Sequence, residues 1–466
     1  MMQRVRGVGL AGLFALLTAC SVGPDYKRPV VDTAAGFKEA NDWKPTEPAD
    51  AINRGPWWLI FNDDVLNGLE DKIDISNQNI KAAAANVENA RALVREAQAG
   101  YWPAVDANIG RTREREGRPS PHTINGAGGS VNWSLDIWGQ VRRSVESNKA
   151  TEQSLAATLA GARLLAQADL ASDYFQLRGQ DQNQVLLDDT VKADEQALKI
   201  TENRYKVGVA ARADVVTAQT QLLSAQAQQV SVAIARAKFE HAIAVLVGEQ
   251  PALFSIAPTK IRTDVPTVPA GVPSELLERR PDIAVAERKV ASANAEIGVN
   301  KAAYFPSLSL TGSATYSGGG GLSQLFAVPN QIWSVGPNLA QHLFAGGLYR
   351  ARVAAARAQW EQTVDAYRET VLEGFEDVED DLVTLRVLEK QSAVEDQVVL
   401  AAREAEKLTL NQYKAGTVPY SSVITAQTTR LANEQTALNV FVQRLTGSVT
   451  LIQDLGGGWN ASELKQ

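Results

Sequence analysis

The chain has 466 residues, of which 45% are hydrophobic and 21% are charged, and its formal net charge is −7. This composition excludes a disordered chain, and an acidic balance without a basic block argues against nucleic acid as a partner. By length alone, the chain could hold about three ordinary domains.

Residues 1–19 are predicted to be a signal peptide. A short basic segment precedes an apolar run, Val8 to Leu17, which is too short to span a bilayer as a mature helix. Cys20, the only cysteine, follows. Leu17-Thr18-Ala19-Cys20 resembles the bacterial lipobox, so we expect acylation of Cys20 and an extended segment over residues 20–56. In such lipoproteins a serine at the next position, here Ser21, implies sorting to the outer membrane. The alternative is a stray cysteine after an ordinary signal peptide.

Long proline-free tracts predict long helices. Proline is absent from residues 122–250 and 338–418, and both tracts are rich in Ala, Gln, Leu and Glu. A helix over residues 140–205 would be about 100 Å long at ~1.5 Å per residue, which suits a rod or the wall of a tunnel.

The segments that follow these helices carry heptads. Over residues 213–248 apolar positions alternate at three- and four-residue steps, interrupted at Gln229 and Arg236. Residues 421–455 show the same pattern, interrupted at Gln427, Glu434 and Ser448. Heptad spacing indicates helices that pack on helices, although an ordinary bundle has the same signature.

Between the helices, apolar and polar residues alternate in runs of about ten residues, the length that a tilted strand needs to cross a bilayer. The runs lie at about 102–115, 128–138, 306–317 and 330–343. Aromatic residues lie near the run ends or on the apolar face, as in an aromatic girdle: Trp102, Trp133, Trp138, Phe305, Tyr316 and Trp333. Pro337 fits poorly, because proline cannot donate to the ladder of hydrogen bonds.

Four strands are too few for a membrane barrel, since the smallest known barrels have about eight. After residue 20 no segment is apolar over the ~20 residues of a transmembrane helix, so a membrane crossing would use strands. An open sheet edge in lipid leaves backbone groups unpaired, at a cost of several kcal/mol each. The chain is therefore expected to oligomerise, with three or more copies favoured if the interior is to hold water.

The second half of the chain repeats the first. Asn203 to Gly208 (NRYKVG) is matched by Asn411 to Gly416 (NQYKAG), and Tyr101-Trp102-Pro103 corresponds to Tyr304-Phe305-Pro306. So long a period indicates a duplicated block and not a solenoid. We expect matching halves at residues 57–260 and 261–466, each with one helix, two strands and two long helices. The expected helices with assigned bounds lie at about 140–205, 213–248, 281–303, 348–413 and 421–455.

An ordered set of motifs resembles one known family. The motifs are GPDYKRP at 23–29, Trp57-Trp58 with Phe61, SLDIWG at 134–139, the segment 273–283 with Arg280-Pro281-Asp282, and AYFPS at 303–307. Together they resemble the TolC-type outer-membrane efflux factors, most closely the lipoprotein branch that serves RND pumps (NodT/OprM-like). The resemblance runs from Cys20 to about Gly457.

The resemblance implies an α+β membrane protein that works as a homotrimer. Each chain would give four strands to a twelve-stranded barrel in the outer membrane of a Gram-negative bacterium, and its helices would form a periplasmic tunnel. An inner-membrane RND pump and a periplasmic adaptor would dock at the helical tip. The duct would carry drugs and other small molecules outward, with no cofactor except the lipid on Cys20.

The repeated Tyr-Lys-x-Gly turns are the expected tip. Glycine suits a turn that needs positive φ, as at Gly208 and Gly416. In the family these turns meet the adaptor, and the corresponding residues here are Val207, Gly208, Val209, Ala415, Gly416 and Thr417.

Family residues near the tip hold the tunnel shut by hydrogen bonds and ion pairs. Asp214 matches the tip aspartate and Tyr413 the tip tyrosine, whereas the family arginine falls on Val418 and the acidic residues fall on Ser422 and Thr425. Arg212, Arg204 or Lys414 could replace the missing cation. The gate candidates are therefore Asp214, Tyr413, Ser422, Thr425 and Arg212. Asp214 has an equal alternative as a helix cap.

Two further segments have structural interpretations. Arg280-Pro281-Asp282 is predicted to start a helix. The acidic run Glu376 to Asp381 is predicted to form a solvated helix face, with a face toward the lumen of the tunnel as the alternative.

An enzyme is disfavoured. His122, His241 and His342 are expected in a loop, a helix and a strand, without metal-ligand spacing, and no Walker lysine follows the glycines at 318–321. The remaining alternatives are a duct of the same fold for peptides, proteins or metal ions, and a lipid-anchored coiled coil without a pore. The mature chain has no methionine, which disfavours a thioether relay for copper.

Overall fold

The computed structural model describes residues 22–42, 56–115, 121–261, 264–268, 273–319 and 325–465. The chain divides into two compact units. Unit 1 comprises Met1–Val31, Ala85–Ala156 and Val285–Glu369, and unit 2 comprises Asp32–Ala84, Ala157–Ala284 and Thr370–Gln466. Each unit takes segments from both sequence repeats. The signal peptide, Cys20 and Ser21 lie outside the described residues.

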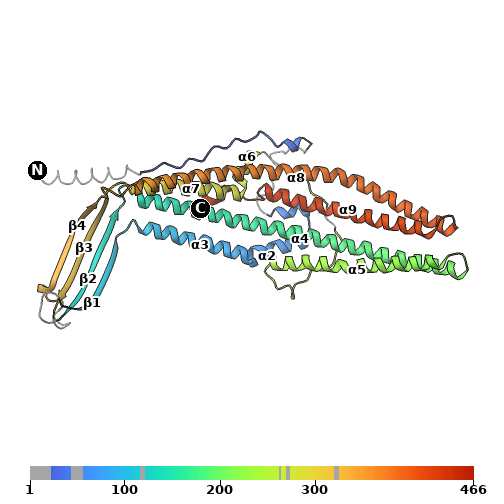
Figure 1. The fold of residues 1–466 in the computed structure, drawn as a ribbon, viewed down its shortest axis with the longest axis horizontal. Coiled ribbons are helices and arrows are strands. Elements are labelled where there is room, and N and C mark those ends of the chain that lie inside the picture. Colours follow the sequence, from blue (N-terminus) through green and yellow to red (C-terminus); the bar gives the residue numbers. More distant parts are fainter. Residues whose placement is uncertain are drawn as a thin grey trace. The chain divides into compact units, whose positions relative to one another are not determined.

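Unit 1 contains one antiparallel sheet with the strand order β1-β2-β3-β4 (Figure 1). The strands are β1 (Ala104–Glu114), β2 (His122–Leu135), β3 (Ser307–Gly318) and β4 (Gln331–Ala340). The predicted α+β fold with four strands and long helices is confirmed.

Strand β2 starts earlier than the expected position near residue 128. The Gly-rich stretch is part of the ladder, because a Cβ on Gly128 would lie 2.8 Å from the Ala314 carbonyl oxygen of β3. Two histidine placements were therefore wrong: His122 lies in β2 and not in a loop, and His342 lies beyond the end of β4 and not in a strand.

The strand register separates the two faces of the sheet. Val105 pairs with Val131, which pairs with Gly312, which pairs with Val335. The neighbouring row is polar, and it joins Asp106, Ser130, Ser313 and Ser334. No described segment of the same chain covers the apolar face, since Ile109 is 87% exposed and Trp333 is 68% exposed. Among the described residues β1 and β4 each have one paired edge, and Pro337 lies on such an edge strand, where proline is tolerated.

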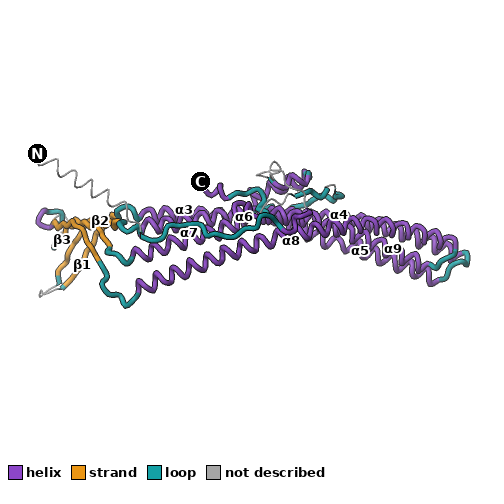
Figure 2. The backbone as a smooth tube through the Cα atoms, turned by 90° about the horizontal axis from the view of Figure 1, so that it is seen from above, coloured by secondary structure: helices purple, strands orange, loops and turns teal. Residues whose placement is uncertain are grey.

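The helices are α2 (Asp64–Ser76), α3 (Gln78–Ala99), α4 (Gln140–Lys206), α5 (Arg212–Leu246), α6 (Pro273–Arg279), α7 (Pro281–Ala302), α8 (Leu348–Ala415) and α9 (Tyr420–Asp454). Short 3-10 helices span Lys38–Asp42, Trp57–Phe61, Val328–Asn330 and Ala461–Lys465. Figure 2 separates the helical and strand segments by colour. None of the described helices is long and apolar enough to cross a membrane.

The repeat is preserved in the hydrogen bonds of unit 2. The sequence predicted one helix before the first strand pair, but Asn77 divides it into α2 and α3. The Asn77 side chain donates to the carbonyl of Leu246, the last residue of α5, at 2.9 Å. Arg280, between α6 and α7, donates to the carbonyl of Asp454, the last residue of α9, at 3.3 Å. Each break therefore supplies a donor that the end of a long helix needs.

The acidic run of α8 is not simply a solvated face. Nη2 of Arg280 lies 2.7 Å from Asp282 and 3.0 Å from Asp377, while Asp381 is half-buried beside Asp454. Burial, followed by the charge of Asp454, raises the pKa of Asp381 to about 8. Glu376 and Asp380 stay exposed as predicted, whereas Asp377 turns to Arg280 and Asp381 is half-buried. The predicted helix start is confirmed, since α7 begins at Pro281 and the Asp282 carboxylate accepts from the Ile283 amide.

The GPDYKRP segment is held within unit 1 by specific contacts. Gly23 has φ +120°, and a Cβ there would lie 2.6 Å from the Cα of Gly298, so only glycine fits. Asp25 pairs with Arg143 at 2.8 Å, and the Tyr26 hydroxyl donates to Glu287. The motif is thus a strap along α4 and α7.

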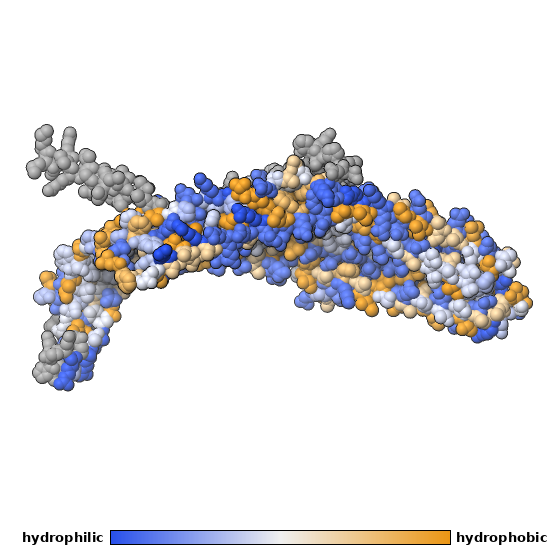
Figure 3. Space-filling model, turned by 45° about the horizontal axis from the view of Figure 1, so that its top comes forward, coloured by the Kyte–Doolittle hydropathy of each residue, from blue (hydrophilic) through white to orange (hydrophobic). Residues whose placement is uncertain are grey.

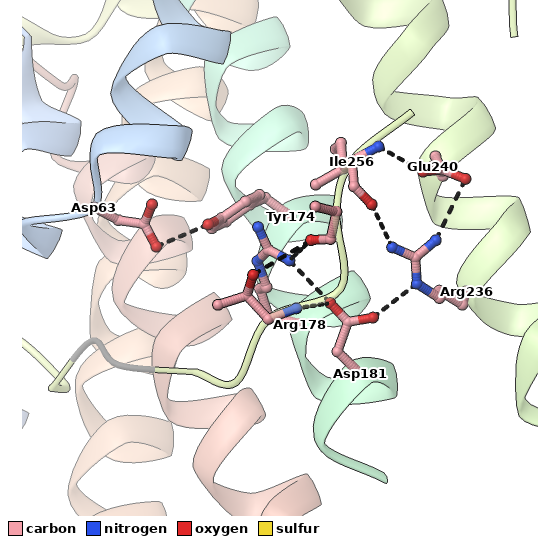
Figure 4. Close-up of polar contacts among 9 residues, drawn as sticks. Asp63, Tyr174, Arg178, Asp181, Arg236, Glu240 and Ile256 are labelled. Carbon is pink, nitrogen blue, oxygen red and sulfur yellow. Dashed lines mark hydrogen bonds and ion pairs between the residues drawn. The ribbon is translucent and has the colours of Figure 1, made fainter. Parts of the chain in front are cut away.

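A buried polar network in unit 2 fixes a loop on two helices (Figure 4). Asp181 of α4 accepts from Arg178 at 2.9 Å and from Arg236 of α5 at 2.7 Å. Arg178 also donates to the Ala257 carbonyl at 2.8 Å, and Glu240 accepts from the Ile256 amide at 2.7 Å. Arg236 interrupts the α5 heptads because it faces this network and not an apolar neighbour.

Candidate functional site: the helical tip

The long helices α4 and α8 end in the same turn, and both turns lie in unit 2. Gly208 and Gly416 have φ values of +79° and +80°. The Val209 amide donates to the Arg204 carbonyl at 2.9 Å, and the Thr417 amide donates to the Gln412 carbonyl at 3.0 Å. This six-to-one bond with a left-handed residue is a Schellman motif, which ends a helix and satisfies its free carbonyls. The sequence prediction of glycine turns is confirmed at both positions.

The residues predicted to meet an adaptor all lie on the surface of the turns: Val207, Gly208, Val209, Ala415, Gly416 and Thr417. Val207 is 73% exposed and Val209 is 64% exposed, which is unusual for valine. Figure 3 shows apolar residues in orange at this end of the helices. The tip therefore presents apolar surface that a partner could cover.

Tyr413 lies inside the tip and joins its two turns. Only 4% of it is exposed, and its hydroxyl donates to Thr201 of α4 at 3.4 Å. The Arg204 guanidinium lies 4.8 Å from the centre of the Tyr413 ring, and Arg204 also donates to the Lys414 carbonyl at 2.9 Å. Arg204, from the first repeat, is thus the cation that meets the tyrosine of the second repeat.

Tyr420 completes this cluster and was not among the predicted residues. Its ring centre lies 5.2 Å from that of Tyr413, and only 2% of the residue is exposed. Burial raises the pKa of the Tyr420 hydroxyl. Its position three residues before buried Val423, at the start of the heptads of α9, was the available sequence signal.

The other gate candidates make local contacts. The half-buried Asp214 carboxylate accepts from the Ala211 amide at 3.3 Å, which is the helix-cap geometry. Arg212 lies 5.9 Å from the Tyr205 ring. Ser422 is half-buried, and the exposed Thr425 donates to the Ser421 carbonyl at 3.1 Å. Asp214 also lies close enough to Tyr420 for its charge to raise the pKa of that hydroxyl, which places Asp214 beside the tyrosine cluster. The described contacts of Arg212, Ser422 and Thr425 within one chain do not include Tyr413.

A second polar cluster joins α4, α8 and α9 farther along the helices from the turns than Tyr413. Arg430 lies 2.6 Å from Glu406 and 2.5 Å from Glu434, and Glu434 also pairs with Arg403 at 2.7 Å. Glu434 interrupts the heptads of α9 because it holds two arginines. Asp194 of α4 is only 1% exposed, and neither of its carboxylate oxygens has a hydrogen-bond partner among the described residues.

Replacing Asp194 with asparagine is expected to stabilise the protein at neutral pH. Burial raises the pKa of Asp194 from 3.8 to about 6, although Arg430 opposes the shift. The folded state therefore holds the proton more tightly than the unfolded state, and stability falls as pH rises from about 4 to 6. A neutral amide at this position would avoid the buried charge, with a gain of roughly 1–3 kcal/mol above pH 7. Thermal unfolding of Asp194→Asn and of the exposed control Glu195→Gln between pH 4 and 8 measures this; an unchanged pH slope in Asp194→Asn would contradict it.

The family model described as "Outer membrane efflux protein" matches residues 70–249 and 272–457. The chain belongs to this family. It is an outer-membrane efflux channel, as the sequence motifs predicted.

The curated relatives match the chain over nearly its whole length. The toluene efflux pump outer membrane protein TtgC of Pseudomonas putida is 29% identical over 97% of this chain and 95% of that protein. The solvent efflux pump outer membrane protein SrpC of Pseudomonas putida is 30% identical over 97% of this chain and 98% of that protein. The solved structure of the outer-membrane channel OprN superposes with a TM-score of 0.87 at 28% identity, over 94% of this chain and 100% of that one.

Proposed function

We propose that three copies of this chain form the passive exit duct of a tripartite efflux system. The observation that carries the proposal is the sheet of unit 1, whose apolar and polar faces are cleanly separated while β1 and β4 each pair on one side among the described residues. In lipid such edges must be closed, and the smallest known barrels need about eight strands. Three copies would supply twelve strands and a lumen lined by the polar rows.

The proposed cargo is small organic molecules, including apolar compounds. The relatives TtgC and SrpC carry toluene and solvent in their names, which supports this class. Energy would come from an inner-membrane pump of the RND type, reached through a periplasmic adaptor, so the chain itself would need neither a catalytic residue nor a cofactor. Acylation of Cys20 would anchor the chain in the outer membrane. Peptides, proteins or metal ions remain the alternative cargo.

The turns of the helical tip are the proposed adaptor contact, and Arg204 with Tyr413 is the proposed latch between them. Both turns expose their outermost residues, whereas the ring of Tyr413 and the Arg204 guanidinium lock α4 to α8. Opening of the tip would require this contact to move. Asp214, Ser422, Thr425 and Arg212 would act at the gate from neighbouring copies.

The tip is tested by placing charge on its apolar surface. Val207→Asp combined with Val209→Asp is expected to abolish drug and solvent resistance in cells that lack the native channel, because buried apolar contacts at an interface centre are typically worth enough to change affinity roughly tenfold or more. Leu253→Asp, at an 80% exposed position in a loop away from the tip, is the matched control. Outer-membrane level and heat-modifiable migration of each variant report assembly. Full resistance with both aspartates in place would rule out adaptor contact through these valines.

A further inference from the structure

A basic pocket lies at the helical end of the sheet in unit 1, and its lining residues are distinct from those of the helical tip. It has a volume of about 570 Å³ and is lined by Val22, Lys301 at the end of α7, Tyr304 and Phe305 just before β3, and Arg350 and Arg357 on the first turns of α8. Arg350 and Arg357 are seven residues apart, with Val353 and Ala354 between them, so one face of α8 forms one wall.

The three cations of this pocket have no anionic partner in the part of the chain that the structure describes. No ion pair joins Lys301, Arg350 or Arg357 to a carboxylate among the residues that the structure describes. Arg350 also lies in the first turn of a 68-residue helix, where the peptide dipoles add positive potential. Cations gathered in a concave site without a carboxylate favour an anion that comes from outside the chain.

Aromatic residues gather beside this pocket, as they do at membrane interfaces. Trp138 stacks on Phe305 at 4.6 Å and donates to the Pro306 carbonyl at 2.7 Å, and Tyr304 lies 5.9 Å from Tyr349. The strand pair Ser307 and Ala340 ends directly beside this group. Tyrosine and tryptophan gather where barrel strands leave the hydrocarbon and meet the headgroups.

Val22, directly before the strap of residues 23–29, lies beside the same aromatic residues. The Val22 amide donates to the Trp138 carbonyl at 3.1 Å, and Val22 follows Cys20, the proposed acylated residue, by two positions. Acyl chains on Cys20 would enter the inner leaflet next to the pocket. In the loop between β4 and α8, Leu343 and Phe344 are 94% and 92% exposed, which suits side chains that face lipid.

We propose that this pocket binds the phosphate of an anionic phospholipid headgroup in the inner leaflet of the outer membrane. Lys301, Arg350 and Arg357 neutralise the phosphate, while Tyr304 and Phe305 cover the glycerol and the first methylenes of the acyl chains. The proposal rests on the membrane location of the channel, and it adds a lipid ligand that secures the assembled barrel at one depth.

Native mass spectrometry of the full assembled protein tests the site. The protein in neutral detergent is titrated with phosphatidylglycerol, with phosphatidylcholine of the same acyl chains, and with inorganic phosphate. Retention of phosphatidylglycerol over phosphatidylcholine is expected. Arg357→Gln should lower that retention roughly fivefold and Arg350→Gln with Arg357→Gln more than tenfold, because each cation near a lipid surface contributes about that factor. Arg352→Gln, on the same helix but outside the pocket lining, should not change it.

Three results would overturn the proposal: equal retention of both lipids, an equal loss in Arg352→Gln, or displacement of the lipid by millimolar inorganic phosphate. Heat-modifiable migration shows that each variant is assembled. Drug resistance in cells separates this inference from the proposed function. An assembled, active channel without lipid preference would remove the headgroup site alone, whereas absence of the wild-type protein from outer membranes would remove both.

Discussion

Replacing Asp181 with alanine is expected to lower the free energy of unfolding by about 3–5 kcal/mol, the cost of breaking a buried ion pair by removing one partner. Asp181 is 5% exposed and accepts hydrogen bonds from Arg178, Arg236 and the Thr259 amide. Its loss leaves Arg178, which is itself only 4% exposed, without its carboxylate partner and leaves Arg236 with Glu240 alone. The loop near Ile256 would lose the hydrogen bond from the Thr259 amide to α4, and Arg178 and Arg236, which hold the carbonyls of Ala257 and Ile256, would lose the carboxylate that orients them (Figure 4).

Thermal and urea unfolding of the purified protein measures this effect. Asp189→Ala is the matched control, because Asp189 lies on the same helix and its side chain is 68% exposed in an ion pair with Lys192. An exposed pair of this kind is worth about 0–1 kcal/mol. A loss at Asp181 no larger than at Asp189 would show that the network does not hold the loop.

Val335→Arg is expected to prevent stable assembly in the outer membrane. Val335 is 68% exposed on the apolar face of β4, and an arginine that faces lipid near the middle of the bilayer costs about 2–4 kcal/mol in each copy. In a trimer this cost would be incurred three times, so we expect loss of the heat-stable oligomer and of efflux.

Ser334→Arg is the paired variant, because Ser334 is the neighbouring residue on the polar face and its hydroxyl lies 2.9 Å from that of Ser313. Arginine there is expected to face water, to leave assembly intact and to change single-channel conductance in planar bilayers. If Ser334→Arg destroyed assembly while Val335→Arg did not, the faces of the sheet would be assigned the wrong way round.

The local conformation of this chain could largely be predicted from the sequence. Alternation with period two predicts strands because side chains alternate across a pleated sheet, and the register then aligns Val131 with Val335 on one face. Glycine after Tyr-Lys predicted two left-handed turns, and both Gly208 and Gly416 have positive φ. The early start of β2 was missed because the same glycines also allow close strand contact, as at Gly128.

The contents of the site were harder to predict. The resemblance to known efflux factors singled out Tyr413, but its partners Thr201 and Arg204 come from the other repeat. The break at Asn77 was missed because its role depends on the free carbonyl of Leu246, at the end of α5. The acidic run of α8 was expected to be solvated, but Asp377 forms an ion pair with Arg280, which is distant in the sequence.

The sequence by itself determined the duplication, the long helices, the sheet with two unlike faces and the family, because period, proline placement and glycine turns are local properties of the chain. Only the tertiary structure decided which charges are paired. It placed Asp181 between two arginines, left Asp194 buried without a hydrogen-bond partner among the described residues, and gathered Lys301, Arg350 and Arg357 around one pocket. The physical reason is that the energy of a charge depends on burial and on partners that are distant in the chain, and neither is encoded in its neighbours along the sequence.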